Sequence, residues 1–131
     1  MIVVDSSGWI EYFTDGPNAG RYGGYLEDPA KVATPTVVVF EVYKLVKRER
    51  TEEDALLAVA QMQKTRVVPL SESLALAAAD VSLERRLAMA DAIVYATAIS
   101  EGAKLVTSDA DLEGLPGVTY LPKGKNAARR R

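Results

Sequence analysis

Short apolar segments alternate with longer helical segments along this chain, and this alternation limits the folds that the chain can adopt. Two strands that are joined through a helix generally run parallel to each other in one sheet. A parallel sheet is covered by helices on both faces, so its strands are short and largely apolar. The sequence therefore predicts an α/β fold with three layers, in which a mainly parallel central sheet is flanked by helices. The expected strands cover residues 2–4, 31–33, 66–70, 104–108 and 118–121.

Residues that start and stop helices set the other expected boundaries. Ser6 and Ser7 can cap a first helix, and Thr51 with three acidic residues after it resembles a capped helix start. Residues 34–36 are expected to lead into the next helix, although its opening Val-Val-Val-Phe also has strand propensity. Residues 66–70 are expected to form a buried strand. The expected helices cover residues 6–14, 19–26, 37–50, 51–64 and 71–102, the last with a break near Leu87.

Two residue types are missing from the sequence, and their absence restricts the possible chemistry. The 131 residues, the length of one domain, include neither cysteine nor histidine. Disulfides, thiolate zinc sites, cysteine nucleophiles and Ser-His-Asp hydrolases are therefore excluded. Any catalysis must use carboxylates, hydroxyls, Lys, Arg or a hard metal ion with oxygen ligands. Since no apolar run approaches the roughly 20 residues of a membrane span and no signal peptide is visible, we expect a cytoplasmic protein without a membrane partner.

Charge is distributed unevenly along the chain. The formal net charge of −2 comes from 16 basic and 18 acidic residues. Residues 123–131 contain five of the basic residues and no acidic one, so residues 1–122 carry 11 basic against 18 acidic residues, a net charge of −7. This division predicts a folded domain over residues 1–122 and a basic C-terminal tail over residues 123–131.

Two aspartates follow predicted strands directly. Asp5 comes after the first strand, and Asp109 comes after the strand that is expected at 104–108. In an open parallel sheet, ligands bind at the carboxyl ends of the strands. Both residues are therefore candidate site residues. Each of them could instead cap the helix that follows it.

Two further acidic residues lie on apolar helix faces. Glu41 has Val37, Val38 and Leu45 among its neighbours at helical spacing. Asp91 is surrounded at the same spacing by uncharged residues in the segment LAMADAIVYATA. A carboxylate that is isolated on an apolar face is costly to bury without a partner. The partner could be an Arg or Lys at the edge of the core, or a metal ion that all four acids share.

A divalent cation explains all four acids together. Mg²⁺ and Mn²⁺ prefer carboxylate and water ligands. One or two such ions can activate a water molecule and stabilise an in-line phosphoryl displacement. The residues therefore point to a metal site at which phosphoryl chemistry can take place.

Four segments of the sequence resemble the acidic signatures of PIN-domain ribonucleases, and more narrowly of the VapC-type toxins of toxin–antitoxin pairs. They are VVDSS at 3–7, the Glu of VVFEVYKLV, ADAIVYATA at 90–98 and LVTSDADL at 105–112. The resemblance covers nearly the whole chain and implies a PIN-like domain. It also implies that Asp5, Glu41, Asp91 and Asp109 form a metal-binding, catalytic acidic quartet. Three further residues would support this quartet: Ser6, Thr107 and Asp111, of which Asp111 could assist or replace Asp109.

The resemblance further implies an endoribonuclease that uses Mg²⁺ or Mn²⁺ and hydrolyses RNA phosphodiester bonds with a metal-activated water. Asp5 and Asp91 would be the principal ligands, and Glu41 would complete the site or act as general base. Asp109 would hold a second metal or a water of the outer shell. The implied partners are the RNA substrate, a cognate antitoxin that inhibits the toxin, and a second copy in a homodimer.

Other functions remain open at this point. A receiver-like signalling domain is also an α/β protein with an acidic cleft, although Val68-Pro69-Leu70-Ser71 stands where its phosphorylated Asp should be. A metal-dependent nuclease that acts on DNA would use the same residues. Trp9, Tyr12 and Phe13 share one helix face that is expected to pack in the core or against a partner.

Overall fold

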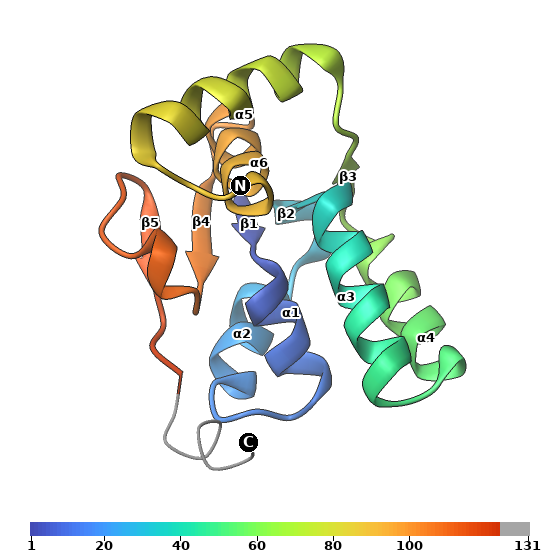
Figure 1. Cartoon of the computed structure of the whole chain (residues 1–131). Coiled ribbons are helices and arrows are strands. Elements are labelled where there is room, and N and C mark those ends of the chain that lie inside the picture. The colour runs from blue at the N-terminus through green and yellow to red at the C-terminus, as the bar shows by residue number, and fades with distance from the viewer. Residues whose placement is uncertain (124–131) are drawn as a thin grey trace.

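The computed structural model describes residues 1–123 and contains one five-stranded sheet (Figure 1). All neighbouring strands are parallel, and their order across the sheet is β3-β2-β1-β4-β5. Helices flank this sheet, so the predicted α/β fold with a parallel central sheet is confirmed. The strands are β1 (Ile2–Val4), β2 (Val32–Pro35), β3 (Arg66–Val68), β4 (Lys104–Thr107) and β5 (Val118–Tyr120).

Six α-helices within the described residues connect the strands, and they agree closely with the expected helices. They are α1 (Ser6–Phe13), α2 (Ala19–Tyr25), α3 (Thr36–Glu49), α4 (Glu52–Met62), α5 (Glu72–Arg85) and α6 (Met89–Ser100). Two short 3-10 helices, η1 (Pro29–Lys31) and η2 (Ala110–Leu112), precede β2 and β5. None of the helices in this part of the chain is long and apolar enough to cross a membrane. The predicted tail, apart from Lys123, lies outside the described residues, and its role stays a prediction.

Local interactions at the helix ends explain most of the boundaries. Thr51 accepts a hydrogen bond from the Asp54 N–H (3.0 Å) and caps α4, as expected. The break near Leu87 is confirmed, since Arg86 has a left-handed backbone (φ 57°) between α5 and α6. The cap of α1 differs from the expectation: Asp5, rather than Ser6 or Ser7, accepts the Ser6 N–H (2.8 Å).

One predicted strand is longer than expected, and one prediction about a strand was wrong. Residues 34 and 35 extend β2, and the predicted helix entry is confirmed because Pro35 is also the N-cap of α3, which begins at Thr36. The strand at residue 66 is short and mostly exposed, with 37% of Val67 accessible, because β3 is the last strand of the sheet and pairs only with β2. The strand order also argues against the receiver-like alternative, since receiver domains have the order 2-1-3-4-5.

The core lies on the central strands, where Val3, Val4 and Leu105 are fully buried. The aromatic face of α1 divides into two parts. Trp9 is buried and stacks on Phe13 with 5.7 Å between the ring centroids, whereas Tyr12 is 40% exposed. Core packing therefore accounts for Trp9. Tyr22 on α2 is also fully buried.

Candidate metal centre

The strand order brings two of the predicted acids to one place. The order of the strands reverses between β1 and β4, because β1 is followed by β2 on one side while β4 and β5 lie on the other. Such a switch point opens a crevice at the carboxyl ends of the two strands. Asp5 directly follows β1, and Asp109 lies two residues beyond the end of β4. Both therefore stand at the edge where an α/β sheet binds ligands.

A cleft of about 780 Å³ opens at this edge, and all four acids of the predicted quartet line it. Glu41 reaches the cleft from α3, and Asp91 reaches it from the first turn of α6. Ser6 also lines the cleft. Thr107, the other predicted supporting hydroxyl, is fully buried and contacts Asp5 from behind. The fold thus brings together acids that are separated by as many as 104 positions in the sequence.

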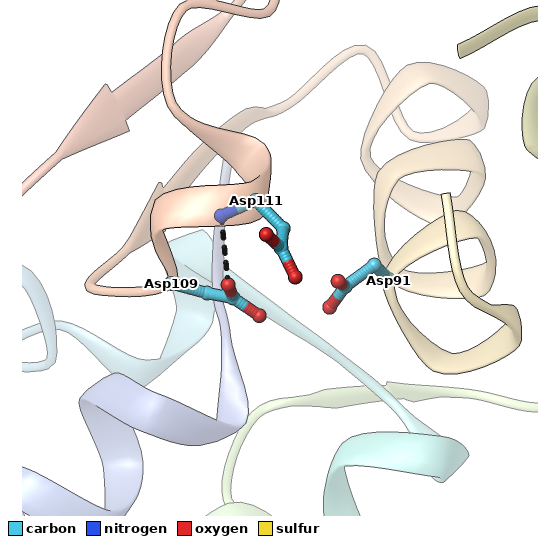
Figure 2. Close-up of side chains that lie close together, drawn as sticks. All are labelled: Asp91, Asp109 and Asp111. Atoms are coloured by element: carbon cyan, nitrogen blue, oxygen red, sulfur yellow. Dashed lines mark hydrogen bonds between the residues drawn. The ribbon is translucent and has the colours of Figure 1, made fainter. Parts of the chain in front are cut away.

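Three carboxylates are closest to one another: Asp91, Asp109 and Asp111 (Figure 2). Each offers an oxygen atom within 4.8 Å of the oxygens of the other two. In Figure 2, Asp91 projects from its helix toward Asp111 of η2 and toward Asp109, the residue that precedes η2. Asp109 also accepts the Asp111 N–H (2.9 Å) and so caps η2. Asp109 therefore both caps η2, as the alternative explanation predicted, and lines the cleft.

Asp5 is the most deeply held of the acids, with 3% of its surface exposed. One carboxylate oxygen accepts the Ser6 N–H, and the other accepts the hydroxyls of Thr107 (2.7 Å) and Ser7 (3.3 Å). These three bonds use at most three of the roughly four lone-pair positions of a carboxylate. Asp5 can therefore be held in place by the protein and still bind a cation.

A set of hydroxyl hydrogen bonds lies behind the acids, and of its members the sequence predicted only Thr107 as a supporting residue. The Ser7 hydroxyl accepts the Ser108 N–H (3.0 Å), and the Thr107 hydroxyl accepts the Asp109 N–H (2.9 Å). The phenol of Tyr22 lies 2.6 Å from the Ser108 hydroxyl. The second serine after Asp5 is a signal for this set, but a helix cap explains the same residue from the sequence alone.

Burial and mutual repulsion raise the pKa of three of these carboxylates. Burial raises the pKa of Asp5 and of Glu41 above their ordinary values. Burial and the adjacent charge of Asp109 raise the pKa of Asp91 to about 7. None of the ion pairs found within residues 1–123 includes Glu41 or Asp91. The ion-pair explanation for these two residues therefore finds no support here.

We expect the protein without added cation to become less stable as the pH rises. In the folded protein the pKa of Asp91 is about 7, above its ordinary value. The stability that Asp91 contributes is therefore present at low pH and is lost as the pH rises through about 7. Thermal unfolding in the presence of a chelator should give a lower melting temperature at about pH 8.5 than at about pH 5.5. Asp91→Asn should flatten this dependence. If Asp91→Asn left the pH dependence of the melting temperature unchanged, that result would contradict its attribution to Asp91.

The donor atoms of the cleft suit a hard divalent cation. Every acidic ligand candidate is a carboxylate, and three of them approach one another closely enough to share an ion. Mg²⁺ and Mn²⁺ favour such oxygen donors and usually keep several waters, which an open cleft can accommodate. A cation would also relieve the repulsion that raises the pKa of Asp91. The residues present therefore fit a magnesium or manganese ion.

Known proteins that are similar to this chain share its fold. A toxin–antitoxin complex from Klebsiella pneumoniae matches with a TM-score of 0.77 and 23% identity, over 91% of this chain and 96% of that one. The Mycobacterium tuberculosis toxin VapC20, described as cleaving the sarcin–ricin loop, matches with a TM-score of 0.70 and 22% identity over 86% and 92% of the two chains. FitAcB from Neisseria gonorrhoeae matches with a TM-score of 0.68 and 20% identity over 83% and 88%.

The sequence itself matches a family model as well. No curated protein is similar enough in sequence to count as a match. The PIN domain model, however, matches residues 2–118 and so includes every strand and helix described above up to the start of β5. The order of elements and the parallel central sheet agree with this match. The chain therefore belongs to the PIN domain family.

Proposed function

We propose that this protein is a metal-dependent endoribonuclease that hydrolyses RNA phosphodiester bonds. The observation that carries the proposal is the convergence of carboxylates from four separate parts of the fold on one open cleft. Membership of the PIN domain family supports nuclease activity. The similar toxin from M. tuberculosis, whose described target is the sarcin–ricin loop, supports RNA over DNA as the substrate.

In this proposal, Asp91, Asp109 and Asp5 bind Mg²⁺ or Mn²⁺. Asp111 assists them, because its carboxylate lies beside those of Asp91 and Asp109. When bound, the cation supplies a water of lowered pKa and offsets negative charge on the phosphate. Glu41 takes the role of proton acceptor, since it faces the same cleft from a different helix and its raised pKa suits a general base.

Basic side chains near the cleft support a phosphate-bearing substrate. Lys44 and Arg48 line a hollow of about 230 Å³ together with Glu41, and Lys123 lines the main cleft. Lys47 and Arg50 line neither of these hollows, whereas Arg48 does and also forms an exposed ion pair with Glu49 (3.2 Å). The phosphate contacts of the proposal therefore involve Lys44, Arg48 and Lys123.

We expect RNA cleavage to require Mg²⁺ or Mn²⁺ and to be abolished by a chelator. The physical reason is that a cluster of carboxylates repels phosphate unless a cation lies between them. The measurement is cleavage of a labelled single-stranded RNA with each metal, with chelator, and with metal restored. A DNA oligonucleotide of the same sequence tests the alternative of a nuclease that acts on DNA, and we expect it to remain uncleaved. Undiminished cleavage in excess chelator would contradict the proposal.

We also propose that the protein is the toxin of a toxin–antitoxin pair. Several similar structures are toxin–antitoxin complexes, which supports an antitoxin as partner. The acidic cleft suits an arginine of such a partner, because a planar guanidinium pairs with two carboxylate oxygens. The half-exposed Tyr12 can contact an apolar helix of the antitoxin, but the buried Trp9 cannot. A homodimer at the centre of the complex is part of the same proposal.

Expression together with the product of an adjacent short reading frame tests this pair. We expect the two proteins to co-purify, the complex to lack ribonuclease activity, and growth to be restored in cells that express the toxin. The size of the complex, measured by light scattering, shows whether two toxin chains are present. An adjacent protein that neither binds this chain nor restores growth would exclude it as the antitoxin.

A further inference from the structure

A buried tyrosine outside the acidic cleft is connected to it by hydrogen bonds. Tyr22 lies on α2, is fully buried, and places its phenol oxygen 2.6 Å from the Ser108 hydroxyl. Ser108 is itself 98% buried, so neither hydroxyl has ready access to bulk water. A buried hydroxyl that loses its partner carries a desolvation cost. The two residues therefore restrain each other's position.

Ser108 occupies a particular position in the chain, between two residues that contact or form the acidic site. Thr107 before it donates to the Asp5 carboxylate (2.7 Å), and Asp109 after it belongs to the group of three close carboxylates. The backbone N–H of Ser108 donates to Ser7 (3.0 Å), whose hydroxyl donates in turn to Asp5 (3.3 Å). Fixing Ser108 therefore fixes the segment that joins the Asp5 contact to Asp109.

The Tyr22 ring has little freedom to move. It packs against Gly8 of α1 so closely that a Cβ atom on Gly8 would overlap the ring. Val4 of β1 lies on the same side, 2.7 Å from the position of such a Cβ atom. Helix α2 carries none of the acids of the quartet, so Tyr22 is its connection to the site through the Ser108 hydroxyl. A rigid, buried hydroxyl of this kind can act as a fixed support.

We propose that Tyr22 is a positioning residue of the acidic site, which holds Ser108 so that Asp109 and Asp5 keep the separation that cation binding requires. The inference rests on the proposed metal-dependent function and extends it to a residue that lies outside the cleft. Groups behind the ligands of a metal site commonly change metal affinity or activity by about 10–100-fold when they are removed. Tyr22 acts in this way through Ser108 and does not touch the cation.

The test is the affinity for Mn²⁺, measured by electron paramagnetic resonance on the full chain after removal of metal. Tyr22→Phe keeps the ring but removes the hydroxyl, and we expect Mn²⁺ to bind about tenfold more weakly. Thr34→Val is the matched control. It removes a buried hydrogen bond of the same length, between the hydroxyls of Thr34 and Thr65 (2.6 Å). Neither of these residues lines the cleft. Its Mn²⁺ affinity should equal that of the unmodified chain.

Ser108→Ala removes the same hydrogen bond from its other side and covers the case in which Tyr22→Phe does not fold. We expect it to weaken Mn²⁺ binding to the same extent, and the double variant to be no weaker than either single one. If Ser108→Ala bound Mn²⁺ as tightly as the unmodified chain does, the role of Tyr22 would be overturned, but the proposed metal centre would not. A failure of the unmodified chain to bind Mn²⁺ would overturn the proposed metal centre and the inference with it.

Discussion

Asp91→Asn is expected to reduce RNA cleavage by more than about a hundredfold while leaving the fold intact. The substitution removes one negative charge from the proposed ligands and preserves the shape of the side chain. Asp91 lies within 4.8 Å of the carboxylates of Asp109 and Asp111, so its loss weakens the attraction for a divalent cation at the place where the charges are densest. The measurement is single-turnover cleavage of a labelled RNA at saturating Mg²⁺.

The stability of the same variant distinguishes a ligand from a structural residue. Without cation, burial and repulsion from Asp109 work against the charged form of Asp91. The free energy of unfolding in chelator should therefore stay level or rise in Asp91→Asn. Asp80→Asn, an exposed change on α5, serves as the control and should alter neither activity nor stability. A loss of about 3–5 kcal/mol in Asp91→Asn would instead identify Asp91 as half of a buried ion pair.

Gly8→Ala is expected to destabilise the protein by about 1–3 kcal/mol, although alanine is normally the better residue in a helix. The added Cβ would overlap the buried ring of Tyr22 and would lie 2.7 Å from a methyl group of Val4. Both neighbours belong to the core, and β1 is a central strand, so relief requires α1 or α2 to shift. The measurement is the free energy of unfolding in urea, in the presence of chelator.

Gly24→Ala is the matched control for this prediction. Gly24 also lies in a helix, but a Cβ atom there would meet no atom within 4 Å. We expect this variant to be more stable than the unmodified chain by about 0.5–1 kcal/mol, because alanine loses less backbone entropy on folding. Equal effects of the two substitutions would show that the close approach of α1 to Tyr22 does not limit residue 8.

Much of the fold could be predicted from local sequence because the signals are themselves local. A run such as Ile2–Val4 favours a strand through its β-branched side chains, and Thr51 caps a helix with its own hydroxyl. The acids were found for the same reason. Glu41 and Asp91 stood out because their immediate helical neighbours are apolar, and such a mismatch is visible without knowing the fold.

The arrangement of these elements depended on contacts that are distant in the sequence. The alternation of strands and helices predicts parallel strands, but it does not determine that β3 lies at the edge, where its residues remain exposed. The hydrogen bond from Thr107 to Asp5 joins residues 102 positions apart, and that of Tyr22 with Ser108 spans 86. Such pairs form only when the crossover helices have set the order of the strands. Local residue patterns thus identify the unusual carboxylates, whereas the packing of strands and crossover helices brings them to one cleft and selects the hydroxyls that hold them.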